Sequence, residues 1–127
     1  MINELAKEIH ENNKSKGFYD DEKNIGEMLC LIHSEVSEAL ECDRKDKYFK
    51  SYFEIFKSKN FVFDCFKKDE NSKHFEAYFK DTFEDELADI MIRVMDLAAF
   101  KGIDLEFHIK AKMKYNSMRP HKHGKKY

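Results

Sequence analysis

Two pairs of acidic residues with the same spacing are the strongest chemical signal in the chain. Glu35 and Glu38 are three residues apart, and so are Glu86 and Asp89. Residues at this spacing share one face of a helix, where like charges repel one another. Both pairs lie beside an apolar seam, so packing of the two segments would place four carboxylates around one point. Because oxygen ligands suit hard cations, the pattern predicts a site for Mg²⁺, with Mn²⁺ as a substitute.

The second acidic pair belongs to a segment that is apolar on nearly all sides, which predicts a buried helix over residues 83–100. Buried carboxylates are costly unless they are paired or coordinate a metal. A di-iron site is disfavoured, because no glutamate is followed by a histidine three residues later. One polar stripe interrupts the apolar surface, and it consists of Glu86, Asp89, Arg93 and Asp96.

A basic segment occupies residues 107–127, which contain seven basic residues and no acid, whereas residues 1–106 carry 16 basic and 25 acidic residues. Lys112, Asn116 and Arg119 follow helical spacing within it. Lysine and arginine bind anionic oxygens, and an asparagine amide suits a phosphate, a sugar or a base. The pattern indicates phosphate binding, and a solvated tail is the alternative.

The elements that must position these residues are expected to be helices. Four glycines and one proline leave few interruptions. The spacing of apolar residues predicts a short helix from residue 2 that ends by residue 14, and further helices over about 22–43, 83–100 and 105–117. Thr82 and Asp104 are the expected caps of the last two helices. The fold class is therefore all-α, a bundle of about four to six helices in a single domain over residues 1–127.

An aromatic-rich insertion, about residues 44–81, separates the two acidic motifs. Residues 41–81 hold 11 of the 18 aromatic residues, and their spacing predicts one or two helices with a short extended stretch at 61–63. A surface loop would not expose so many aromatic side chains. We therefore expect part of the insertion to pack against a second subunit in a homodimer or homotetramer. Extension of the monomer's own core is the alternative.

Composition and motifs exclude several other classes of protein. There is no run of 18 apolar residues, and the first residues lack the basic and apolar regions of a signal peptide. Three scattered cysteines without a CxxC pair are typical of reduced thiols. P-loop, HExxH and GxGxxG motifs are absent. We expect a cytoplasmic protein that binds no membrane, and the acidic body makes nucleic acid an unexpected partner.

In their order along the chain, these motifs resemble those of the MazG-like nucleotide pyrophosphohydrolases. The resemblance rests on residues 32–40, on 84–104 and on 112–125. It covers about residues 22–43 and 82–126, where ExxE and ExxD motifs precede a Lys-Asn-Arg-Pro pattern. The 47 residues between Glu38 and Glu86 exceed the spacing of compact family members, and the excess is the aromatic insertion.

The resemblance implies a Mg²⁺-dependent hydrolase of nucleoside triphosphates. Such an enzyme cleaves between the α- and β-phosphates with a metal-activated water and releases a monophosphate and pyrophosphate. Glu38 or Glu35 would orient the water or take its proton. The metal ligands that the resemblance implies are Glu35, Glu38, Glu86 and Asp89.

The resemblance also implies how the substrate is held. Lys112 and Arg119 would bind phosphates, and Asn116 would contact the sugar or a phosphate. Asp96 would support the site or contact the substrate. Three alternatives stay open: a phosphoribosyl-ATP pyrophosphatase, a nucleoside diphosphatase and a non-catalytic helical interaction module.

Overall fold

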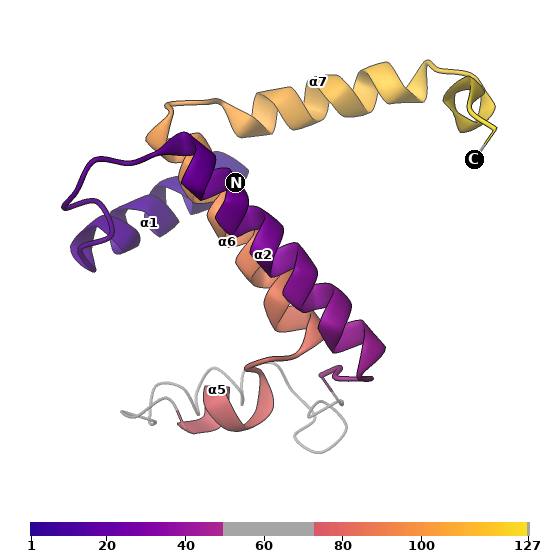
Figure 1. Ribbon diagram of the computed structural model, residues 1–127. Coiled ribbons are helices and arrows are strands. Elements are labelled where there is room, and N and C mark those ends of the chain that lie inside the picture. Colours follow the sequence, from indigo (N-terminus) through magenta and orange to yellow (C-terminus); the bar gives the residue numbers. More distant parts are fainter. Residues whose placement is uncertain (50–72, 127) are drawn as a thin grey trace. The chain divides into compact units, whose positions relative to one another are not determined.

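The computed structural model describes residues 1–49 and 73–126 (Figure 1). The predicted all-α class is confirmed, because this part of the chain contains helices and no strand. No helix in the described ranges is long and apolar enough to cross a membrane. The extended stretch predicted at 61–63 lies outside the described residues. The helices are α1 (Ile2–Ser15), α2 (Ile25–Arg44), α5 (Lys73–Tyr78), α6 (Phe83–Phe100), α7 (Leu105–Ser117) and the 3₁₀ helix η1 (His121–Gly124).

The two helices that follow the insertion have the predicted bounds, because their ends are encoded locally. The Thr82 hydroxyl accepts a hydrogen bond from the Asp85 amide (3.3 Å) at the start of α6. The Asp104 carboxylate accepts one from the Phe107 amide (2.9 Å) at the start of α7. Gly102, between the two helices, has φ +64°, a conformation that glycine adopts without strain.

The chain is arranged in two compact units. The terminal unit consists of Met1–Asn24 with Ile92–Tyr127, and the central unit is Ile25–Met91. Helix α6 contributes its first half to the central unit and its second half to the terminal unit.

In the terminal unit, α1 begins beside the start of α7. The Asn3 amide nitrogen donates to Asp104 Oδ1 (2.7 Å), and Asn3 Oδ1 accepts from the Glu106 backbone amide (3.1 Å). The Ile2 amide in turn donates to Glu106 Oε2 (3.1 Å). These bonds occupy amides in the first turns of both helices, which have no partner within the helix.

In the central unit, α2 and the first half of α6 lie side by side and run in opposite directions (Figure 1). The end of α2 contacts the approach to α6, because Cys42 Sγ lies 3.5 Å from the Asp81 carbonyl oxygen. The Phe83 amide donates to the Lys47 carbonyl (2.8 Å). Two further contacts join the ends of the insertion: the Phe49 amide donates to Glu84 Oε2 (2.8 Å), and the Phe49 ring stacks on Phe79 (4.7 Å between centroids).

The buried apolar core is small. Among the described residues no large side chain is fully buried, and Leu87 and Met91 of α6 are each 45% exposed. The prediction that α6 is buried on nearly all sides is therefore wrong for its first half within a single chain. The buried apolar residues are Ala6, Ala39, Cys42, Met95 and Ala98.

Candidate metal centre

Three of the four predicted acidic ligands converge in the central unit. One carboxylate oxygen from each of Glu35, Glu86 and Asp89 lies within 4.8 Å of the others. Glu35 is 6% exposed and Glu86 is 5% exposed, while Asp89 is half-buried. Helical geometry brings them together, since Glu86 and Asp89 share one face of α6 and Glu35 comes from the facing side of α2.

The electrostatics of this cluster oppose its full ionisation. Burial raises the pKa of Glu86 from its ordinary 4.5 to about 7, and repulsion from Glu38, Glu35, Asp85 and Asp89 adds to the effect. Burial also raises the pKa of Asp85, against the stabilising hydrogen bond from the Asp81 amide. In the folded chain without a cation, Glu86 is therefore largely protonated below neutral pH.

Glu38 differs from the other three predicted ligands. Its side chain is exposed, and its carboxylate does not join the three that lie within 4.8 Å of one another. It nevertheless lies close enough for its charge to be the second cause of the raised pKa of Glu86. Glu38 is therefore positioned at the open edge of the cluster, where a water or a substrate oxygen could reach it.

The donor set fits a small, hard cation. Oxygens bound to the same Mg²⁺ ion lie up to about 4 Å apart, because each metal–oxygen bond is about 2.1 Å long. One oxygen each of Glu35, Glu86 and Asp89 lie within 4.8 Å of one another, so small side-chain movements would bring them to this arrangement. A cation would also counteract the burial and the repulsion that together raise the pKa of Glu86.

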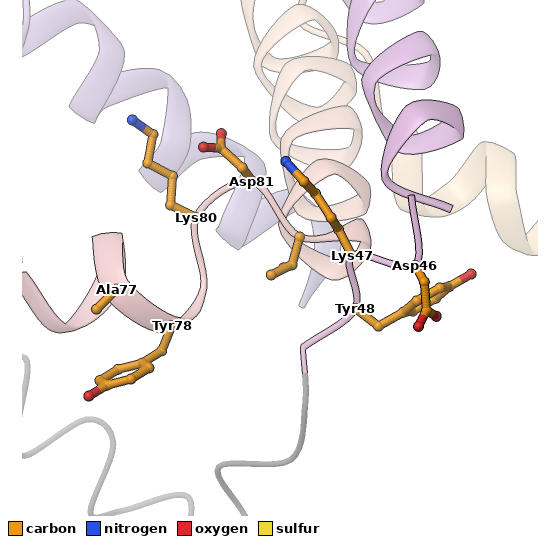
Figure 2. Close-up of a pocket in the computed structure, with 8 residues that line it drawn as sticks. Asp46, Lys47, Tyr48, Ala77, Tyr78, Lys80 and Asp81 are labelled. Carbon is orange, nitrogen blue, oxygen red and sulfur yellow. The ribbon is translucent and has the colours of Figure 1, made fainter. Parts of the chain in front are cut away.

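A pocket of about 480 Å³ opens where α2 ends and α6 begins. Figure 2 shows Tyr78, Lys80 and Asp81 on the segment before α6 and Lys47 and Tyr48 on the segment after α2, with the two tyrosine rings directed away from each other. The pocket borders the first turn of α6, because the Asp81 amide donates to Asp85 Oδ2 (3.0 Å) and the Thr82 hydroxyl accepts from the Asp85 amide (3.3 Å). The full lining is Asp46, Lys47, Tyr48, Ala77, Tyr78, Lys80, Asp81 and Thr82.

Asp96 lies in a separate polar network within the terminal unit. It is 8% exposed, and its two oxygens accept hydrogen bonds from different residues of α1. His10 Nδ1 lies 2.7 Å from Oδ1, and the Asn13 amide nitrogen donates to Oδ2 at 2.9 Å. Burial and the neighbouring Asp96 carboxylate raise the pKa of Tyr19, whose ring lies 4.6 Å from that of His10. Within this unit, Asp96 joins α1 to α6.

The sequence did not predict the partners of Asp96, although one signal was available. Asn13 lies on the same side of α1 as Ile2, Ala6 and Ile9, where an apolar residue would be expected. A polar residue in an apolar stripe indicates a buried polar partner. Its identity required the tertiary structure, because His10 and Asp96 are 86 positions apart.

The predicted phosphate-binding residues belong to the terminal unit. Lys112 and Arg119 both lie over the ring of Tyr115, at 5.1 and 5.6 Å from its centroid. Arg119 also donates to the His123 carbonyl (3.3 Å). The Asn116 amide oxygen is buried and makes no hydrogen bond with the described residues. Lys112 and Asn116 thus lie on α7, as their spacing predicts, whereas Arg119 follows the end of this helix.

Comparison of the chain with family models, with curated proteins and with solved structures finds no match.

Proposed function

We propose that the protein is a Mg²⁺-dependent nucleoside triphosphate pyrophosphohydrolase. The observation that carries the proposal is the convergence of Glu35, Glu86 and Asp89, two of them buried, with oxygens within 4.8 Å. Such a cluster is costly to the fold unless its charges are paired or coordinate a cation. The MazG-like order of the motifs supports the nucleotide as substrate.

In this proposal, Glu35, Glu86 and Asp89 hold Mg²⁺, which supplies charge neutralisation at phosphate oxygens and acidifies water. Glu38, exposed at the edge of the cluster, orients the attacking water or accepts its proton. The MazG-like resemblance assigns phosphate binding to Lys112 and Arg119, and contact with the sugar or a phosphate to Asn116, and we retain these roles as part of the proposal.

The pocket between the end of α2 and the start of α6 is the proposed site for the remainder of the nucleotide. Its volume of about 480 Å³ suits a small ligand. Lys47 and Lys80 supply positive charge, and Tyr78, 39% exposed, supplies a ring on which a base can stack. Lys80→Ala is expected to raise KM more than it lowers kcat, while Lys101→Ala, an exposed lysine in the terminal unit, serves as the matched control.

The decisive experiment is a panel of nucleotides incubated with the protein and Mg²⁺, scored separately for pyrophosphate and orthophosphate. Release of pyrophosphate from triphosphates supports the proposal. Release of orthophosphate from diphosphates would indicate a nucleoside diphosphatase. Turnover of phosphoribosyl-ATP alone would indicate a phosphoribosyl-ATP pyrophosphatase. Glu86→Gln is the inactive control, because it removes a ligand charge without changing the side-chain volume.

A non-catalytic interaction module is the competing function, and the large exposed apolar side chains of α2 and α6 favour it. The two functions differ in a measurement that needs no substrate. The enzyme must gain thermal stability from millimolar Mg²⁺, since the cation binds the folded state only. Absence of both this gain and any turnover would favour the interaction module.

A further inference from the structure

We infer that the pocket beside α6 selects ribonucleotides over 2′-deoxyribonucleotides, and that the Asp81 carboxylate does so by accepting a hydrogen bond from the 2′-hydroxyl. The inference rests on the proposed function, because it takes the phosphates to be held at the acidic cluster. Asp81 lines the pocket immediately before α6 begins. A carboxylate that accepts from the ribose 2′-hydroxyl is a recurrent means of recognising ribose in nucleotide-binding proteins.

Asp81 lies between the acidic cluster and Tyr78, as the sugar of a nucleotide lies between its phosphates and its base. The Glu86 amide donates to the Thr82 carbonyl (3.0 Å), so Thr82 lies one helical turn, about 5.4 Å, before Glu86 along the axis of α6. Asp81 directly precedes Thr82, and Tyr78 lies farther from α6, at the end of α5 (Figure 2). Phosphates held at the cluster therefore place the sugar near Asp81 and the base toward Tyr78.

Other polar side chains of the pocket are less suited to this hydrogen bond. Ammonium groups only donate, which excludes the two lysines as acceptors. The Thr82 hydroxyl already donates to the Phe79 carbonyl (2.7 Å) and accepts from the Asp85 amide (3.3 Å). The Tyr48 hydroxyl donates to an Asp43 carboxylate oxygen. A carboxylate, which only accepts when it is ionised, is the group that suits a hydroxyl donor.

The pocket has two aspartates, and Asp81 is the one next to α6. Its amide donates to Asp85 Oδ2 (3.0 Å), and its carbonyl oxygen lies 3.5 Å from Cys42 Sγ, so its backbone is fixed to both helices of the central unit. Asp46 instead belongs to the segment that follows α2 (Figure 2). Both aspartates have a left-handed backbone, with φ +59° at Asp81 and +52° at Asp46. They therefore form a matched pair for substitution.

The first test measures binding and needs no turnover. Titration calorimetry with Mg²⁺ present compares each ribonucleoside 5′-monophosphate with its 2′-deoxy and 2′-fluoro analogues. The unmodified protein is expected to bind the ribose form about tenfold more tightly, because a hydrogen bond to a charged group contributes on that scale. The 2′-fluoro analogue should bind like the deoxy form, since fluorine cannot donate a hydrogen bond. Equal affinity for the three forms, or binding of none, overturns the inference.

The second test uses variants of the two aspartates. Asp81→Gly keeps both backbone contacts of this residue, and glycine adopts φ +59° without strain. It should bind the ribose form as weakly as the deoxy form. Asp81→Asn retains an acceptor oxygen and should recover part of the preference, and it also serves if the glycine variant does not fold. Asp46→Gly should retain the full preference, whatever its effect on affinity. A preference that survives in Asp81→Gly, or that is lost equally in Asp46→Gly, overturns the inference.

Failure of this inference is distinguishable from failure of the proposed function. Release of pyrophosphate from ribose and deoxyribose triphosphates with equal kcat/KM would support the enzyme and overturn the selection of ribose. Tighter binding of ribose monophosphates that depends on Asp81, without release of pyrophosphate from any triphosphate, would support the selection of ribose and overturn the enzyme.

Discussion

Glu86 is the residue whose state depends most directly on solution conditions. Its pKa is about 7 in the folded chain and 4.5 in its ordinary environment. The folded state therefore retains a proton that the unfolded chain releases between these two values. As pH rises through this window, the free energy of unfolding of the Mg²⁺-free protein should fall, by up to about 3 kcal/mol from this residue alone. Below the window both states are protonated, and the contribution vanishes.

Urea unfolding with a chelator present, on both sides of that window, checks this prediction. Glu86→Gln should make the free energy of unfolding depend less on pH. At a pH above about 7, the metal-free variant should be more stable than the metal-free unmodified protein. Added Mg²⁺ should restore the stability of the unmodified protein and have little effect on the variant. A pH dependence that is the same in both proteins would contradict the assignment to Glu86.

The two glutamates of α2 are expected to have separable roles. Glu35 is buried within the three-acid cluster, whereas Glu38 is exposed at its edge. Glu35→Gln should therefore weaken Mg²⁺ binding by about tenfold or more, while Glu38→Gln weakens it much less and lowers kcat. Titration calorimetry with Mg²⁺, combined with steady-state kinetics, separates the two effects. An equal loss of affinity in both variants would instead make Glu38 a ligand.

The spacing along the sequence predicted four acids around one point, and three of them, Glu35, Glu86 and Asp89, lie within 4.8 Å of one another. The position of the fourth, Glu38, outside this group has a geometric cause. Two residues three positions apart on a helix differ by about 60° in direction. When Glu35 faces α6, Glu38 is turned toward solvent. Which member of the pair faces inward depends on the packing of α2 against α6, which the spacing alone does not specify.

At the scale of elements, the connection between α1 and α6 in the terminal unit is the most specific polar contact. His10 and Asp96 are both largely buried, with side chains 15% and 11% exposed. His10→Ala should reduce the free energy of unfolding by about 1–3 kcal/mol, because it leaves a buried carboxylate with an unfilled acceptor.

A double-mutant cycle with Asp96→Ala, followed by urea unfolding, measures the pairwise part of this effect. A coupling of about 1 kcal/mol or more is expected for two groups in direct contact. Lys7→Ala, at an exposed position of α1, is the control for loss of a side chain from the helix. Additive effects of His10→Ala and Asp96→Ala would show that the 2.7 Å contact contributes nothing to stability.

The helix bounds could be predicted where local chemistry specifies them. Thr82 and Asp104 cap α6 and α7, and both helices begin where expected. Helix α2 instead starts at Ile25, three residues later than predicted. The residues before it include Tyr19, whose ring packs 5.2 Å from that of Phe100. This contact joins distant parts of the sequence, so no local pattern could reveal it.

At the scale of the whole molecule, the basic C-terminal segment should contribute to binding more than to folding. Helix η1 has no buried residue, and the contacts of Arg119 are with Tyr115 and His123. Deletion of residues 119–127 should therefore raise KM for a triphosphate several-fold and change the melting temperature little.

A triple variant, Lys122→Gln with Lys125→Gln and Lys126→Gln, separates the effect of charge from that of chain length. If these lysines attract phosphate, the triple variant should show part of the increase in KM that the deletion causes. The difference in KM from the unmodified protein should become smaller when salt is added. Normal affinity of the deletion variant for Mg²⁺-nucleotide would show the segment to be a solvated tail.

The contacts that join Phe49 to Glu84 and Phe79 have a consequence for how the protein can change in evolution. They bring the two ends of the insertion together beside the helix pair, so the chain leaves and returns at nearly the same place. Closing such an excursion costs only about 0.6 kcal/mol more for each doubling of its length. The residues between Phe49 and Phe79 can therefore change in sequence and number without moving Glu35, Glu86 or Asp89. Proteins with the same α2–α6 pair could then differ in this segment while retaining the three acids.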